Sequence, residues 1–268
     1  MSLPNILVVI SHDTGRHISP YGVETVATPT FERLAVESVR FTQAFSCAPQ
    51  CSPARAALFS GQYPHQVGVM GNIGREHGWT FPQDQRHAGR IFHELGYESW
   101  LFGLQHESYE PESLGFDHVE LGFSVLDAAE HLARRLDARN PARPFYCQIG
   151  CPETHRPWDR FDTPADSSEG VSVPTYLNDG PATRADMAQF QGYVKRLDTG
   201  LGQILDLLDA RGLVDDTIVV VTTDHGLAVP HAKCTLLESG TGVFLFMRWP
   251  GGQWRTGATD ALVSHVDL

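Results

Sequence analysis

The sequence lacks any apolar run long enough to cross a lipid bilayer. A helical span needs roughly 20 consecutive apolar residues, and the apolar stretch nearest the N-terminus, Ile6–Ile10, is far shorter and has no basic segment before it. A secretory signal peptide needs such a basic segment. We therefore expect no membrane insertion and no signal peptide, and a cytoplasmic location for the chain as it stands.

Cysteine and positive charge are also scarce. The five cysteines among 268 residues are an odd number, which argues against a disulfide framework and favours a reducing compartment. Lys and Arg number 20 against 32 acidic residues, a net charge of −12. This charge disfavours nucleic-acid binding, because it repels a polyanion. A small anionic substrate would need cations supplied locally.

Strand-like apolar segments alternate with helical patterns along the chain. The expected strands cover Asn5–Ile10, 98–102, 144–150, 216–226 and 242–251, and the expected helices cover 28–39, 127–140 and 184–211, with another that ends at Gly96. Thr28 is expected to cap the first helix. The alternation predicts an α/β fold with a mixed, mostly parallel sheet sandwiched by helices. The polar stretch from Trp158 to Pro181 is expected to be a long functional loop.

Two acidic motifs follow predicted strands. Asp13 comes after the first strand, and Asp224 and His225 follow the most β-branched one. Functional sites of open α/β sheets gather at the carboxyl ends of the strands, so the two motifs together predict a divalent-metal site. The alternative is that each aspartate only caps the turn before the next glycine.

A cysteine stands where a short helix is predicted to begin. Cys51 is followed by "SPAR", and the helix is expected to end at Gly61. Unpaired N–H groups at a helix start and the guanidinium of Arg55 make an anion site, in which Cys51 could act as a low-pKa nucleophile. A four-cysteine zinc site is the alternative, formed by Cys47, Cys51, Cys147 and Cys151. The three-residue gaps and neighbouring prolines disfavour it.

These segments together resemble the sulfatase family. Cys51-x-Pro53-x-Arg55 is similar to the signature in which a modifying enzyme oxidises the cysteine to formylglycine. Five further segments resemble family motifs and follow in the family's order: "PNILVVISHDTG", "GYESWLFGLQH", "ETHRPW", "TIVVVTTDHG" and "HAKCTLLESGTGVFLFMRWPG". The resemblance implies the fold of the alkaline phosphatase superfamily and hydrolysis of sulfate esters or N-sulfates. "HRPW" is similar to sulfatases that act on sulfated sugars.

The resemblance also implies roles for single residues. One hydroxyl of hydrated formylglycine at position 51 would attack sulfur, and the second would then expel sulfate as the aldehyde returns. Arg55 would orient the diol, Lys233 would hold the sulfate, His106 would lie near the diol, and His155 would contact the sulfate or the leaving oxygen. The implied metal ligands are Asp13, Asp224 and His225, with His12 as a further candidate. Calcium is the family default, and imidazole ligands would favour manganese or zinc.

The sequence departs from the family pattern at three positions. His12 stands where the family has aspartate, Leu104 where it has lysine, and Ser60 where it has threonine. A phosphonate monoester or phosphodiester hydrolase of the same superfamily is therefore one alternative, and a catalytically silent binding protein with unmodified Cys51 is another. We interpret His65, His87 and His231 as surface or packing residues.

The resemblance treats residues 1–268 as the larger, catalytic domain. In the family a smaller subdomain follows the pattern "DALVSHVDL", with which this sequence ends. We therefore expect a fragment of a longer chain, with a missing C-terminal subdomain, bare apolar surface that favours homo-oligomers, and weak activity. The expected partners are a small sulfated substrate and the enzyme that makes formylglycine.

Overall fold

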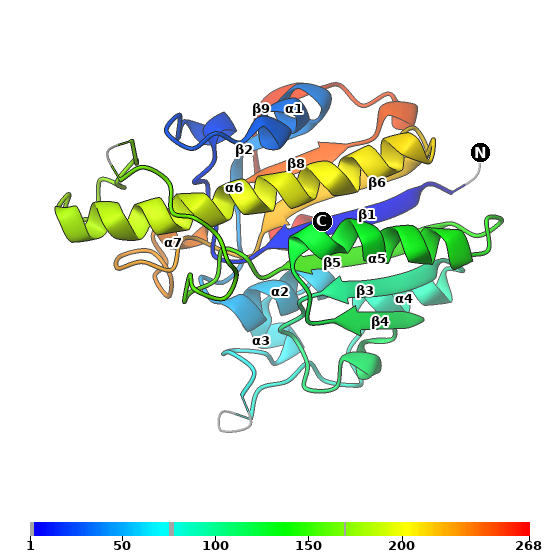
Figure 1. Cartoon of the computed structure of the whole chain (residues 1–268). Coiled ribbons are helices and arrows are strands. Elements are labelled where there is room, and N and C mark those ends of the chain that lie inside the picture. Colours follow the sequence, from blue (N-terminus) through cyan, green and yellow to red (C-terminus); the bar gives the residue numbers. More distant parts are fainter. Residues whose placement is uncertain (1–2, 75–77, 169) are drawn as a thin grey trace.

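The apolar segments of the sequence form one nine-stranded sheet with helices on both faces (Figure 1). The computed structural model describes residues 3–74, 78–168 and 170–268. The strands are β1 (Asn5–Ser11), β2 (Val39–Phe45), β3 (Glu98–Gly103), β4 (His118–Leu121), β5 (Phe145–Cys151), β6 (Thr217–Thr223), β7 (Gly242–Val243), β8 (Leu245–Arg248) and β9 (Gly257–Ser264). Their order is β4-β3-β5-β1-β6-β8-β2-β7, and β9 pairs with β2.

The sheet is mixed and mostly parallel, as the sequence predicted. β4, β3, β5, β1 and β6 run parallel, and β8 is antiparallel to β6. The expected strand at 242–251 is instead two short strands separated by Phe244. The sequence also failed to predict β2, β4 and β9, because most of their side chains are partly or fully exposed and leave no apolar pattern.

The helices cover the sheet in two layers. They are α1 (Pro29–Glu37), α2 (Cys51–Ser60), α3 (Pro64–Val67), α4 (Ala88–Glu94), α5 (Val125–Ala138), α6 (Pro181–Ala210) and α7 (Glu238–Thr241), with short 3-10 turns at Ser19–Tyr21, Pro111–Leu114, Pro250–Gly252 and His265–Asp267. On central strand β1, Leu7 and Val9 pack with the core under α1, α5 and α6, whereas Val8 and Ile10 pack with the core under α2 and α4. This alternation explains why β1 is apolar throughout.

The cap of α1 comes from a distant residue. Thr28 occupies the N-cap position, but its side chain does not cap the helix. The carboxylate of Asp198, on α6, instead accepts hydrogen bonds from the backbone N–H groups of Thr30 and Phe31, at 3.1 and 2.9 Å. The expected cap is therefore wrong, because a long-range carboxylate takes the place of the local hydroxyl.

The helix predicted after Cys51 is confirmed. α2 begins at Cys51 and ends at Ser60, and Gly61 closes it with a φ of +65°. All of its residues from Cys51 to Phe59 are buried. The polar stretch that begins at Trp158 forms no helix or strand in its described residues until Pro181 starts α6. None of the helices in the described residues is long and apolar enough to span a membrane.

Gly200 of α6 is the point where α6 and α5 approach each other closely. A Cβ atom there would lie 2.5 Å from Val125 Cγ1 and 2.8 Å from Val125 O. We expect Gly200→Ala to lower the free energy of unfolding by about 1–3 kcal/mol, because this contact is too short for a methyl group. Denaturant unfolding measures the change. The neighbouring exposed variant Thr199→Ala is the control and should stay within about 0.5 kcal/mol of the parent. A Gly200→Ala protein as stable as the parent contradicts the close approach.

Candidate active site

The site forms where neighbouring parallel strands end. β1 lies between β5 and β6, and the last residues of the three strands are in register. Asp13 follows β1, His155 follows β5 and Asp224 follows β6, while His106 comes after β3 on the far side of β5. The strand order thus explains how side chains more than 200 positions apart meet at one edge of the sheet.

Two buried aspartates form the base of the site. Asp13 and Asp224 are both fully buried. Asp224 Oδ1 accepts hydrogen bonds from the backbone N–H groups of Asp13 and His225, each at 2.9 Å. Asp224 Oδ2 lies 3.1 Å from Arg55 Nε and 3.0 Å from His12 Nδ1. The turn-capping alternative is wrong for both aspartates, because the N–H groups of Gly15 and Gly226 donate to the backbone oxygens of His225 and Gly240. The second oxygen of Asp224 faces cationic side chains of the site.

Cys51 lies at the centre of these groups. Its Sγ atom is 3.3 Å from His225 Nε2, 3.3 Å from Lys233 Nζ and 3.8 Å from Asp13 Oδ1. Lys233 Nζ also donates to both carboxylate oxygens of Asp13, at 2.9 Å each. The start of α2 thus brings the thiol within contact of a cation, an imidazole and a carboxylate.

The surroundings of Cys51 favour its thiolate. Burial alone would raise the pKa of the thiol, but the nearby His12 and hydrogen bonds from His106, His12 and His155 lower it well below its usual range. Burial would likewise lower the pKa of His12, yet the charge of Asp224 raises it to about 9. Each charged group is therefore stabilised by the others.

Three side chains of the site are partly exposed to solvent. His12, Asp13, Cys51, Arg55, Asp224 and His225 are buried, whereas His106, His155 and Lys233 are partly exposed. The His12 ring centroid lies 4.7 Å from that of His155 and 6.0 Å from that of His106. The structure thus brings all the predicted site residues together, and the three partly exposed ones form the side that a substrate can reach.

The donor set fits a divalent cation. Ligand atoms of His12, Asp13, Cys51 and Asp224 all lie within 4.8 Å of one another, and His225 Nε2 lies 3.0 Å from Asp13 Oδ1. Two fully buried carboxylates need positive charge nearby, which Arg55 and Lys233 supply in this arrangement. The residues present therefore suit a metal ion that would share or replace the contact with Lys233.

Sequence reasoning missed two residues behind the site. Glu107 and Gln148 are fully buried. Glu107 Oε2 accepts from the backbone N–H of His106 at 2.6 Å, and Gln148 Nε2 lies 3.4 Å from Glu107 Oε1. Burial raises the pKa of Glu107, although the nearby charge of Arg55 opposes that shift. Gln148 is a polar side chain in a strand that is otherwise apolar or small, and that irregularity is the signal that could have identified it.

The residues interpreted as surface or packing residues lie outside the site. His65 and His231 are exposed, and buried His87 accepts a hydrogen bond from Gly89 N at the start of α4. The four-cysteine alternative is wrong for the described residues: Cys147 and Cys151 pack in the core on β5, and no group able to hold a metal joins them to Cys47 and Cys51.

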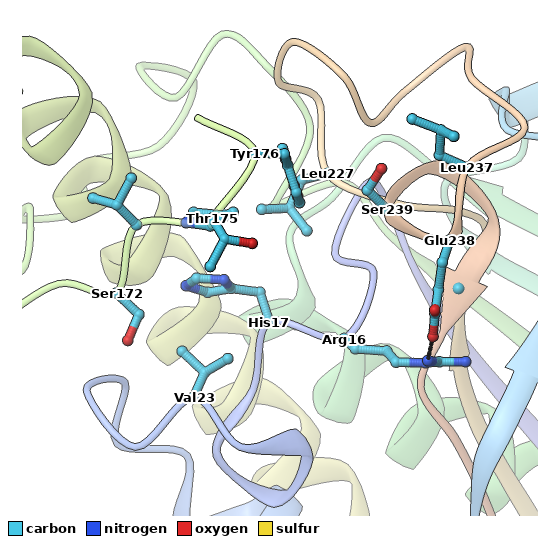
Figure 2. A pocket seen from close by; sticks show the side chains of 13 residues that line it. Arg16, His17, Val23, Ser172, Thr175, Tyr176, Leu227, Leu237, Glu238 and Ser239 are labelled. Carbon is cyan, nitrogen blue, oxygen red and sulfur yellow. Dashed lines mark hydrogen bonds and ion pairs between the residues drawn. The ribbon is translucent and has the colours of Figure 1, made fainter. Parts of the chain in front are cut away.

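A separate hollow of about 580 Å³ is lined by residues such as Arg16 and Leu227, which lie close in sequence to Asp13 and His225. None of the site residues lines this hollow. Figure 2 shows its lining, in which Arg16 pairs with Glu238 and Leu227 belongs to the loop that later carries Lys233. Arg16 follows Asp13 by three positions, yet its guanidinium bonds to the backbone oxygens of Ala44 and Val243. We assign the chemistry to the buried cluster around Cys51, because among the described residues a nucleophile, carboxylates and cations converge only there.

Glu153, near the end of β5, makes the stability of the fold depend on pH. Its Oε1 accepts from the backbone N–H of Val125 at 2.6 Å, at the start of α5. Burial raises the pKa of Glu153 from 4.5 to about 7, although hydrogen bonds and the charge of Arg196 oppose the shift. The folded state therefore holds a proton that the unfolded chain releases between these two pH values.

We expect the free energy of unfolding to fall, relative to that of Glu153→Gln, as pH rises from about 4.5 to 7. The loss should reach about 3 kcal/mol at most, since each pKa unit corresponds to about 1.4 kcal/mol. Glutamine keeps an acceptor for Val125 N but does not titrate. Denaturant unfolding of both proteins across this range tests the prediction. Parallel pH profiles for the two proteins would show that Glu153 titrates normally.

Three comparisons with known proteins show what this chain is similar to. The sequence matches the family model described as Sulfatase over residues 4–129 and 124–268. It is 28% identical over 297 residues to N-sulphoglucosamine sulphohydrolase of Homo sapiens, covering 98% of this chain and 59% of that protein. The first relatives are thus longer, and the chain spans 50% to 59% of their length.

Two solved structures share the fold. One comes from a Bacteroides thetaiotaomicron locus for the metabolism of multiple glycosaminoglycans, with a TM-score of 0.82, 21% identity and coverage of 99% of this chain and 71% of that one. The other is the phosphonate monoester hydrolase of Agrobacterium radiobacter, with a TM-score of 0.74, 19% identity and coverage of 98% and 72%. At such identities the likeness establishes the fold alone, because one fold hosts several activities.

Proposed function

Because the chain belongs to the sulfatase family, we propose that it hydrolyses sulfate esters or N-sulfates of sulfated sugars, with Cys51 as the precursor of a formylglycine nucleophile. The observation that carries the proposal is the position of Cys51 Sγ, 3.3 Å from both Lys233 Nζ and His225 Nε2 at the start of α2. Formylglycine supplies, when hydrated, two hydroxyls on the carbon that now bears the thiol.

The partly exposed side chains suit the sulfate group. Lys233, His106 and His155 surround Cys51 on its open side, where their N–H groups can bind the sulfate oxygens and His155 can protonate the leaving oxygen or nitrogen. Arg55 also has structural partners in addition to the role that the resemblance implies. Its Nε bonds to Asp224 and its Nη2 to Ser11 O, so it holds Asp224 in place, and the same positive charge beside Cys51 can orient the diol.

Asp13, Asp224, His225 and His12 are the residues that would hold a divalent cation. The cation would supply positive charge that favours an ionised hydroxyl at position 51. The family default is calcium, which prefers oxygen ligands. The two imidazoles, His12 and His225, make manganese or zinc the better match for this donor set.

The choice of sulfate over phosphorus esters rests on the sequence relative and not on the fold. The human relative is named for action on N-sulphoglucosamine, whereas both kinds of hydrolase share the fold. The test measures kcat/KM of the protein in which Cys51 has been converted to formylglycine. The substrates are a matched aryl sulfate, aryl phosphodiester and phosphonate monoester, followed by N-sulfated glucosamine. We expect the highest kcat/KM on a sulfated substrate. A higher value on the phosphodiester or phosphonate assigns the chain to the other hydrolase.

We expect conversion of Cys51 to precede the completion of folding. Cys51 is 0% exposed, as are Ala54 and Arg55 of the same signature, so a modifying enzyme cannot reach them in the folded chain. We expect the modifying enzyme to convert Cys51 in the denatured or nascent chain but not in the folded chain. Intact mass measures the converted fraction. Alkylation of exposed Cys234 in the same folded sample is the control for reagent access. Rapid conversion of folded chain contradicts the prediction.

A further inference from the structure

One group of side chains at the site combines nitrogen and sulfur ligands. Donor atoms of His12, Cys51 and His106 all lie within 4.8 Å of one another. They come from three separate segments: the loop after β1, the start of α2 and the loop after β3. We propose that the chain whose Cys51 is still a thiol binds a zinc ion through Cys51 Sγ, His12 and His106. This binding function goes beyond the proposed hydrolysis and does not depend on it.

The chemistry of these donors selects zinc over calcium. A thiolate and two imidazoles are the soft and borderline ligands that zinc takes, often as three protein ligands with a fourth position open. Calcium takes oxygen ligands almost exclusively. His106 and the nearby His155 are partly exposed, so water can reach the fourth position from the open side of the site.

One carboxylate pairs with the ring of His12, and another binds the backbone of His106. His12 Nδ1 lies 3.0 Å from Asp224 Oδ2, the arrangement in which a ligating histidine bonds through one ring nitrogen to a carboxylate and offers the other to the metal. The backbone of His106 is fixed by Glu107 Oε2 at 2.6 Å. Its Nδ1 is buried and has no hydrogen-bond partner in the described part of the chain.

Leu104 lies in the same loop as His106, after β3. A leucine there contributes no positive charge that would repel a metal ion from His106. Conversion of Cys51 would remove the sulfur and with it one of the three ligands. We therefore expect zinc binding in this form to belong to the unconverted chain alone.

The test uses the full 268-residue chain with Cys51 unconverted, as verified by intact mass, after treatment with a chelator. Titration with Co²⁺ should reach one equivalent and give a thiolate-to-cobalt charge-transfer band together with the strong visible bands of tetrahedral cobalt. Zn²⁺ should displace the cobalt, and Ca²⁺ should not. Binding without a thiolate band, or displacement by Ca²⁺, would overturn the proposal.

Variants locate the ion. Cys51→Ser and His106→Ala should each weaken Zn²⁺ binding at least about a hundredfold, because loss of a direct ligand should exceed the 10- to 100-fold effect of outer-shell partners. Exposed Cys234→Ser and His65→Ala are the matched controls and should bind as the parent does. If His106→Ala does not fold by circular dichroism, His106→Gln replaces it.

Asp13→Asn separates this site from the carboxylate site. If Asp13→Asn abolishes Zn²⁺ binding while His106→Ala and Cys51→Ser leave it unchanged, the ion occupies the carboxylates and the proposal is wrong. Retention of the thiolate band in Asp13→Asn supports it. Sulfate turnover is not a readout in these experiments, so their failure leaves the proposed hydrolysis standing, and absence of turnover leaves the zinc site standing.

Discussion

Cys51→Ala should reduce the turnover of sulfated substrate at least about a thousandfold, since removal of a catalytic nucleophile costs this much or more in well-studied hydrolases. The fold should survive, because alanine favours helices and Cys51 is the first residue of α2, not part of a strand. Measurement of kcat/KM and of thermal unfolding on the same preparations separates the two effects.

The matched control for Cys51→Ala is Cys147→Ala. Cys147 is also fully buried, but it lies in the middle of β5 and packs in the hydrophobic core. We expect that variant to lose stability and keep its turnover. If Cys51→Ala retains turnover within about tenfold of the parent, Cys51 is not the nucleophile precursor.

Asp13→Asn should lower turnover at least about a hundredfold, because it removes the charge that pairs with Lys233 and would bind the metal. Both Asp13 carboxylate oxygens lie 2.9 Å from Lys233 Nζ. The backbone of Asp13 has a φ of +51°, which asparagine tolerates better than most residues. The variant should therefore fold. Elemental analysis should show less divalent metal bound at the site of Asp13 and Asp224 than in the parent.

Asp198→Asn is the control for the aspartate variant. Asp198 is also buried, but it caps α1 away from the site. We expect that variant to melt at a lower temperature and to turn over substrate at the parent rate. Parent-like turnover and metal content in Asp13→Asn would contradict the assigned role of Asp13.

The strands with continuous apolar sequence could be predicted because they are buried on both faces. β1, β5 and β6 have this property, and it also placed Asp13 and Asp224 at the ends of neighbouring strands. The short helix at Cys51 was predicted, with its end at Gly61. Local sequence patterns were sufficient to predict an element wherever its structure depends mainly on residues within that element.

Features that depend on pairing between distant segments could not be predicted. β2 and β9 pair with each other at the edge of the sheet, and their side chains are mostly exposed or half-buried. Asp198 caps a helix 168 positions away. The bond from Arg55 to Asp224 joins residues 169 positions apart, so no pattern near Arg55 in the sequence could indicate that its guanidinium pairs with this carboxylate.

The dependence of sulfate release on the converted fraction of Cys51 tests the central claim most directly. Chain produced with and without the modifying enzyme is mixed in known proportions, and intact mass gives the converted fraction. The account predicts that sulfate release from a sulfated sugar rises in proportion to that fraction and is zero for unconverted chain. Equal release by unconverted chain, or no release from fully converted chain, would contradict it.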